Sequence, residues 1–204
     1  MISNESLIYN KLCELHPNGL GSITSLSRNT TGKRDFIISD AKAFNYDLVH
    51  NCSSAYVEEK KEKTPDALFL HDNSLYFIEF KEGNSDKHDI RLKIYEGLTS
   101  LFHLVSKNIP AIGRTNFMDL NINYAVICRH KGNNGNQNSF LNTLNDTSKR
   151  YSLKNIEGFL VKKTRVIEDG QLALELLHKI SDGAIQNITI FEYLGTTQSF
   201  SKNT

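Results

Sequence analysis

The segment that decides the fold is TPDALFLHDNSLYFIEFK, which runs from Thr64 to Lys81. It contains two apolar, aromatic-rich stretches, 66–70 and 75–79, separated by the sequence His-Asp-Asn-Ser. Nearly continuous apolar residues are typical of strands that are covered on both faces, and Asp and Asn favour the tight turn of a hairpin. The segment therefore predicts two antiparallel strands joined at residues 71–74.

Ionisable side chains stand at the open end of this predicted hairpin. A two-residue turn at 72–73 places Asp66 opposite Glu79, with their Cβ atoms about 5 Å apart. The period of a strand also places Lys81 on the same face as Glu79, about 6.8 Å further along. Two carboxylates at this distance repel each other, and a divalent cation removes the conflict. The pattern predicts a Mg²⁺ or Mn²⁺ site that supports hydrolysis of a phosphodiester bond.

Helices and strands are predicted on both sides of this hairpin. Helices are expected at 4–16, 86–107, 140–149 and 171–180, and strands at 35–39, 45–50, 123–128, 158–162 and 188–193. In the longest of these helices, apolar residues recur every three or four positions and so form one buried side. Helices that alternate with buried strands predict one α/β domain over residues 1–195, and the polar segment 196–204 predicts a disordered tail.

The composition excludes several classes of protein. The 204 residues include 24 Lys and Arg against 23 Asp and Glu, and 39% are hydrophobic, so collagen-like, coiled-coil and wholly disordered chains are excluded. A net charge of +1 means that any binding of nucleic acid must depend on a local basic patch. No apolar run approaches the roughly 18 residues of a membrane helix. The first 15 residues do not resemble a signal peptide, and the three cysteines are scattered, so we expect a cytoplasmic protein.

At the hairpin, the sequence resembles the PD-(D/E)xK nuclease superfamily, which has the restriction-endonuclease-like fold. Pro65-Asp66 corresponds to the first half of that motif, and Glu79-Phe80-Lys81 corresponds to the second half. The predicted elements from about residue 5 to residue 128 also follow the family's α-β-β-β-α-β order, with a central mixed β-sheet flanked by helices. The resemblance implies that Asp66 and Glu79 bind the metal and that Lys81 is the catalytic lysine. It also implies nucleic acid as the substrate, with DNA favoured over RNA.

Three further residues are candidates for the same site. Members of the family often carry another acidic residue in the first helix, and Glu5 lies nearer than Glu14 to the apolar side of that predicted helix. Glu5 is therefore the candidate third metal ligand, although an acidic residue also favours a helix N-terminus. Lys87 and Arg91 lie one turn apart at the start of the long helix, where they are candidates for binding a nucleic-acid phosphate.

Two alternatives stay open at this point. The chain could keep the fold and act without turnover, as a binding module in a larger assembly. It could also be an unrelated α/β protein in which the motif occurs by chance, with Glu79 and Lys81 forming an exposed pair and Asp66 only beginning a strand. A homodimer is compatible with each of these interpretations.

Overall fold

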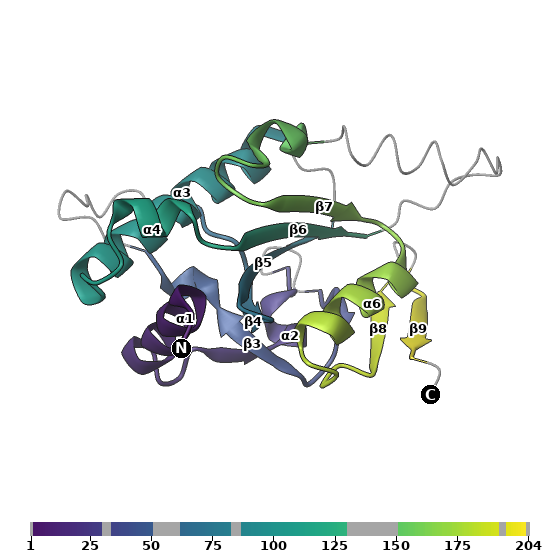
Figure 1. The fold of residues 1–204 in the computed structure, drawn as a ribbon. Helices are drawn as coiled ribbons and strands as arrows, with labels where there is room; N and C mark the ends of the chain where they lie inside the picture. Colours follow the sequence, from purple (N-terminus) through teal and green to yellow (C-terminus); the bar gives the residue numbers. More distant parts are fainter. Residues whose placement is uncertain are drawn as a thin grey trace.

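The computed structural model describes residues 2–29, 34–50, 62–82, 87–129, 151–191 and 195–202. These residues form an α/β structure in which helices flank a mixed six-stranded sheet, with a second sheet of three strands beside it (Figure 1). The helices are α1 (Asn4–Leu15), α2 (Ile23–Leu26), the 3₁₀ helix η1 (Tyr46–Leu48), α3 (Lys87–Asn108), α4 (Arg114–Met118), the 3₁₀ helix η2 (Leu153–Ile156) and α6 (Gly170–Ile180). The strands are β1 (Leu20–Ser22), β2 (Ile37–Ile38), β3 (Lys42–Asn45), β4 (Ala67–His71), β5 (Ser74–Lys81), β6 (Ile122–Cys128), β7 (Lys163–Ile167), β8 (Asn187–Phe191) and β9 (Thr197–Ser201).

The larger sheet has the strand order β1-β3-β4-β5-β6-β7. Neighbours from β1 to β5 are antiparallel, whereas β6 is parallel to β5 and β7 is parallel to β6. Parallel neighbours need a crossover connection, and α3 lies in the connection from β5 to β6. The strand β7 forms one edge of the sheet, uppermost in Figure 1.

The predicted hairpin is confirmed in position and register. Asp72 and Asn73 have φ angles of 47° and 50°, so the two central residues of the turn are left-handed, as a type I′ hairpin turn requires. The strands pair from His71 opposite Ser74 to Ala67 opposite Ile78. This turn has the right-handed twist of the flanking strands, and it therefore fixes which residues face each other at the far end of the hairpin.

Each face of the larger sheet has its own hydrophobic core. On β5, Leu75 and Phe77 belong to the core that α1 and α3 complete. Ile78 and Phe80 belong to the core on the other face, which α6 and the smaller sheet complete. Since side chains alternate along a strand, Glu79 and Lys81 lie on the face that α3 covers.

Two of the predicted strands differ from the structure. Residues 45–50 were expected to be a strand, but the strand β3 ends at Asn45 and the 3₁₀ helix η1 follows. The Asn45 side chain accepts a hydrogen bond from the N–H of Asp47 at 3.1 Å, and this local cap competes with an extended backbone. Residues 158–162 were also expected to be a strand, but Gly158 turns the chain with a φ of 76°, and the strand β7 begins only at Lys163.

The prediction of a disordered tail at 196–204 is wrong for its central residues. Thr197–Ser201 form the strand β9, which pairs antiparallel with β8. The physical reason is Phe200, which packs against the core beneath α6, where Gly170 leaves room for its ring. The helix expected at 140–149 lies outside the described residues.

Two further properties of the described residues bear on the expectations from composition. No helix in this part of the chain is both long enough and apolar enough to cross a membrane. Cys13 and Cys128 are free thiols, and Cys128 is buried in the core beneath α3. The predicted helices at 4–16, 86–107 and 171–180 are present as α1, α3 and α6, with ends that differ from the prediction by one residue.

Candidate functional site

The structure brings Asp66 and Glu79 together at the open end of the hairpin. The N–H of Asp66 donates to the carbonyl of Ile78 at 3.1 Å, and its Oδ2 accepts from the N–H of Phe80 at 2.6 Å. Because these two bonds reach residues on either side of Glu79, they hold the Asp66 carboxylate beside the Glu79 carboxylate. The predicted pairing of these two side chains, called the acidic pair below, is confirmed.

Lys93 of α3 lies between the two carboxylates. Its Nζ is 3.1 Å from Asp66 Oδ1 and 2.8 Å from both oxygens of Glu79. Lys81 adds a second ammonium, with its Nζ 2.9 Å from Glu79 Oε1. Two carboxylates and two ammonium groups therefore form a cluster with no formal net charge. The point that Lys93 Nζ occupies is called the cation position below.

The cluster is enclosed on the Glu79 side and open on the other. The Glu79 side chain has 0% exposure, whereas Asp66, Lys93 and Lys81 are 18%, 19% and 21% exposed. A charge without water needs partners to remain stable, and Glu79 has both lysines as partners. The open side gives solvent access to the three less buried groups.

Burial and mutual repulsion change the acidity of the acidic pair. Burial first, and then the charge of Asp66, raise the pKa of Glu79 to about 7, against the opposing effect of Lys93 and Lys81. Burial also raises the pKa of Asp66, although Lys93 and the Phe80 N–H act in the opposite direction. Burial acts to lower the pKa of Lys93, but the charges of Asp66 and Glu79 outweigh it and raise that pKa above its ordinary value.

The raised pKa of Glu79 predicts how stability depends on pH. Between pH 4.5 and about 7 the folded protein binds more protons at Glu79 than the unfolded chain does, so its free energy of unfolding falls as the pH rises. We expect a loss of about 3 kcal/mol across this window in EDTA, and no further loss from this group at higher pH. Urea unfolding at pH 5, 6, 7 and 8 measures the loss, and Glu79→Gln should remove it. Equal slopes in both proteins would contradict the shift.

A packing contact with Gly97 holds α3 close to the acidic pair. A Cβ atom at position 97 would lie 2.7 Å from Cδ of Pro65, the residue before Asp66, so only glycine permits this approach. The hydroxyl of Tyr46 donates to the carbonyl of Gly97 at 2.9 Å and ties the same turn of the helix to η1. Lys93 lies one turn earlier on α3, and these contacts therefore place its ammonium over the carboxylates.

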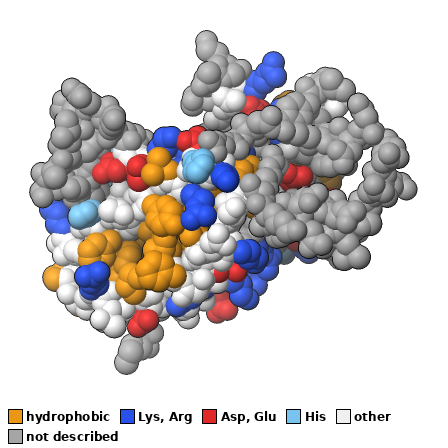
Figure 2. Space-filling view, turned by 90° about the horizontal axis from the view of Figure 1, so that it is seen from above, with side chains coloured by type: hydrophobic (Ala, Val, Ile, Leu, Met, Phe, Trp, Pro, Cys, Tyr) orange, Lys and Arg blue, Asp and Glu red, His pale blue; other side chains and the backbone are white. Residues whose placement is uncertain are grey.

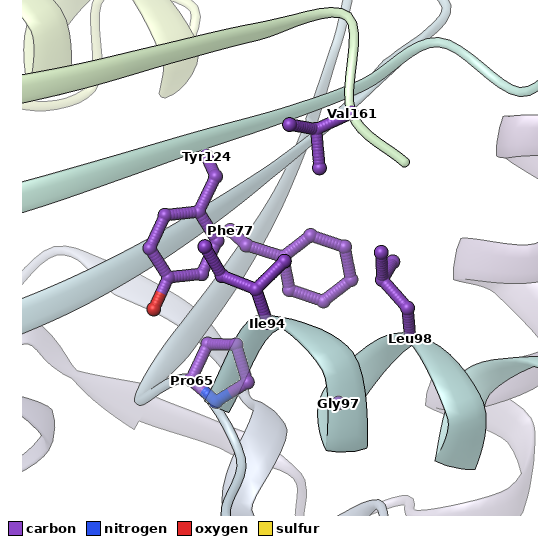
Figure 3. A pocket seen from close by; sticks show the side chains of 7 residues that line it. All are labelled: Pro65, Phe77, Ile94, Gly97, Leu98, Tyr124 and Val161. Atoms are coloured by element: carbon purple, nitrogen blue, oxygen red, sulfur yellow. The ribbon is translucent and has the colours of Figure 1, made fainter. Parts of the chain in front are cut away.

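A narrow apolar crevice adjoins this contact (Figure 3). It is lined by Pro65, Phe77, Ile94, Gly97, Leu98, Tyr124 and Val161. Tyr124 points its hydroxyl away from Leu98 and Val161 (Figure 3). That hydroxyl is buried without a hydrogen-bond partner among the described residues. Burial first, and then the charges of Glu79 and Asp66, raise the pKa of Tyr124, so Tyr124 is a neutral donor near the acidic pair.

The residues present fit a divalent cation. Asp66 and Glu79 direct three oxygens at one point, and the Lys93 ammonium already shows that this point accepts positive charge. Mg²⁺ is commonly held by one or two carboxylates, with water and substrate oxygens completing six ligands. Within the described ranges, no three or more His, Cys, Asp or Glu side chains are arranged so that they could hold a metal ion together, so this site offers two carboxylates and would depend on other oxygens. Lys93 Nζ occupies this point, so a metal ion would have to displace it.

Glu5 does not join this cluster. Its Oε1 accepts a hydrogen bond from the N–H of Asn121 at 2.8 Å, and Asn121 comes just before β6. The first residue of β6 pairs with Leu75, four residues before Glu79, so Glu5 lies about 13 Å from the acidic pair along the strands. Glu5 caps a strand end, and its expected place in the metal site is wrong because the first helix crosses the opposite end of β5.

Lys87 and Arg91 also lie away from the carboxylates. Arg91 donates to the carbonyl of Ser152 at 3.2 Å and to the hydroxyl of Tyr95 at 3.2 Å. Lys87 is exposed at the beginning of α3, and no ion pair joins it to another described residue. Arg91 therefore connects α3 to the segment that contains η2, and neither side chain contacts the acidic pair.

The sequence analysis did not identify Lys93 as part of the site, although the pattern of buried small residues in α3 indicates that Lys93 lies on the buried side of the helix. Gly97 and Ser100 lie four and seven residues after Lys93, and both are buried. Small residues at this spacing form a side of the helix that approaches the protein closely, and Lys93 extends that side. Lys87 and Arg91 were the predicted phosphate-binding residues of this helix. Lys93, which lies between Arg91 and the buried Gly97, was not predicted to take part in the site.

Comparison of the chain with family models, with curated proteins and with solved structures found no match. The geometry of the cluster formed by Asp66, Glu79, Lys81 and Lys93 is therefore the basis for a functional interpretation.

Proposed function

We propose that this chain is a divalent-metal-dependent nuclease that hydrolyses phosphodiester bonds at Asp66, Glu79 and Lys81. The observation that carries the proposal is the convergence of two carboxylates from neighbouring strands on one cation position, with Lys81 beside them. Burial of charged groups at the end of a hairpin costs folding free energy, and such clusters are common at functional sites. A hydrolytic metal site would explain why the charges are placed here.

The order and direction of the elements support the same proposal. The elements α1, β3, β4, β5, α3 and β6 occur in this order along the chain, with β1, α2 and β2 inserted between α1 and β3, η1 between β3 and β4, and α4 between α3 and β6. The strands β3, β4 and β5 are antiparallel neighbours, and β6 is parallel to β5. Such an order is compatible with the α-β-β-β-α-β order that the resemblance to the PD-(D/E)xK superfamily implies. Asp66 directly precedes β4, and Glu79 and Lys81 lie in the last three residues of β5, so the motif residues share one end of these two strands.

Each side chain has a role that its position permits. Asp66 Oδ1 and the Glu79 oxygens would hold Mg²⁺ or Mn²⁺, while the Phe80 N–H fixes the orientation of Asp66. A bound ion would polarise a phosphoryl oxygen and lower the pKa of a water molecule. Lys81 contacts Glu79 and is partly exposed on the open side of the cluster, where its ammonium can orient a water molecule and balance negative charge on a phosphate. Lys93 would have to leave the cation position for the ion to bind, and its ammonium would then be a second positive charge nearby.

One observation favours a second candidate function, that of a binding module without turnover. Lys93 and Lys81 together neutralise the acidic pair, so the cluster has no unpaired charge even without a metal ion. A structural role, in which the neutral cluster holds α3 against the hairpin, is sufficient to explain this arrangement. The two functions differ in whether a divalent cation displaces Lys93, which is a measurable property of the purified protein.

The proposal predicts cleavage of nucleic acid that requires a divalent cation. Purified protein should cut at least one of four substrates, namely plasmid, linear duplex, single-stranded DNA or RNA, with Mg²⁺ or Mn²⁺, and should cut none in EDTA. Asp66→Asn removes a ligand and should be inactive when purified in the same way, which excludes a contaminating nuclease. If the wild type cuts none of the four substrates with Mn²⁺ present, the binding module becomes the better interpretation.

A further inference from the structure

A basic cleft lies on the sheet face opposite the acidic pair. It has a volume of about 300 Å³ and is bordered by Lys162, Lys163 and Arg165 at the β7 edge and by Lys179 on α6. Arg165 shares a face of β7 with Ile167, which belongs to the core beneath α6, whereas Glu79 faces α3. We call this feature the β7–α6 cleft.

The four cations of the β7–α6 cleft are available to a ligand. All four side chains are exposed, and no ion pair or side-chain hydrogen bond joins any of them to another residue in the described ranges. This differs from the candidate metal site, where each lysine already contacts a carboxylate. A ligand that enters the cleft therefore has no internal salt bridge to break.

The cleft continues into a second hollow of about 470 Å³ that shares Arg165 and Lys179 with it. Lys154 also lines this hollow and pairs with Glu157 at 2.9 Å, and Glu175 is its only acidic lining residue among those described. The two hollows together present five basic side chains against one acidic side chain. Because the whole chain has a net charge of +1, the remainder is net negative, and the basic excess is concentrated here.

Figure 2 shows the molecule from above. Lys and Arg side chains lie at several places on this face, with Asp and Glu side chains beside some of them. Lysines on an edge strand also discourage pairing between sheets. That role needs neither a cleft nor a cation on the facing helix, whereas Lys179 supplies positive charge from the second wall.

We propose that the β7–α6 cleft binds the phosphodiester backbone of a nucleic-acid strand, at a site separate from the one that cuts it. Lys163 and Arg165 stand two residues apart on one face of β7, about 6.6 Å along the strand, and Lys179 faces them from α6. This row of cations suits an extended polyanion with regularly spaced charges. The choice of nucleic acid over other polyanions rests on the proposed nuclease function. The observation of a basic cleft does not depend on that function.

Binding of labelled 30-nucleotide DNA, single-stranded and duplex, tests the proposal in EDTA, where no cutting occurs. Four phosphate contacts predict a slope of about −3 for the logarithm of the binding constant against the logarithm of salt concentration. The double variant Lys163→Gln with Arg165→Gln should bind at least tenfold more weakly, with a slope that is smaller by about 1.5. The matched control, Lys107→Gln with Arg114→Gln, removes the same charge from exposed positions on α3 and α4 and should bind like the wild type.

Three results would overturn the proposal. The first is no binding by the wild type at low salt, and the second is an equal loss in the cleft variant and the control. The third is equal competition by DNA and by a polyglutamate chain of similar length, since the cleft would then not distinguish nucleic acid from an acidic polypeptide. Binding that depends on the cleft, in a protein that cuts nothing with Mn²⁺, would keep this inference and reject the proposed nuclease.

Discussion

Lys81→Ala is expected to lower the rate of phosphodiester cleavage at least 100-fold while the fold stays intact. The ammonium of Lys81 lies 2.9 Å from Glu79 Oε1 and reaches the open side of the cluster, where charge develops during hydrolysis. Removal of one well-placed electrostatic partner commonly costs a factor of 10² to 10³ in turnover. Initial rates with Mn²⁺ on the best substrate measure the loss, and thermal unfolding shows whether the protein still folds.

Two comparisons make this result specific to Lys81. Lys107→Ala removes an exposed lysine from the other end of α3 and should leave the rate unchanged. The Mn²⁺-dependent rise in melting temperature should survive in Lys81→Ala, because Asp66 and Glu79 remain to hold the ion. Equal rates in the wild type and Lys81→Ala would remove Lys81 from the proposed mechanism.

Lys93→Met is expected to destabilise the metal-free protein and to strengthen its response to metal. Methionine keeps an unbranched side chain of nearly the same length but has no ammonium, so among the described residues Lys81 is then the one ammonium that contacts the acidic pair. Loss of one partner from a buried ion pair costs roughly 3–5 kcal/mol, which for a chain of this size lowers the melting temperature by about 6–20 °C. The loss should be largest at pH 8 and should shrink as the pH falls, because the carboxylates then become protonated.

Addition of Mn²⁺ should reverse most of this loss. A cation that binds only the folded protein stabilises it by about 2.7 kcal/mol at 100 times its Kd. In the wild type the ion must first displace the Lys93 ammonium, so the variant should reach the same stabilisation at a lower Mn²⁺ concentration. Calorimetry at pH 8, with a Mn²⁺ titration after EDTA is removed, measures both effects, and Lys107→Met is the control. Identical Mn²⁺ titrations of wild type and Lys93→Met would show that the ion does not use the cation position.

The hairpin was predictable because its determinants are local. Asp72 and Asn73 adopt the left-handed turn that their types favour, and the period of two then fixes the neighbours of Glu79. The position of Asp66 beside Glu79 followed from the same arithmetic. Hydrogen bonds of Asp66 to both neighbours of Glu79 were not foreseen, because they depend on the detailed path of the backbone at the strand end.

The parts that could not be predicted depend on how distant elements pack. Lys93 meets the acidic pair only because Gly97 brings α3 against Pro65, and a helical pattern alone does not state which residue faces which strand. Glu5 was placed wrongly for the same reason, since its sequence gives the buried side of α1 but not the end of the sheet that α1 crosses. The strand β9 depends on Phe200, whose burial requires α6.

The close approach at Gly97 has a consequence for how the chain tolerates mutation. A methyl group there would meet Pro65 Cδ at 2.7 Å, so α3 would have to shift away from the hairpin by several tenths of an ångström. Lys93 is carried by the same helix, and the cluster would open without the loss of any charged residue. A search for inactivating substitutions among ionisable residues alone would miss this position. An alanine at position 97 that arose during evolution would therefore move Lys93 away from the acidic pair, although every residue of the motif remained in place.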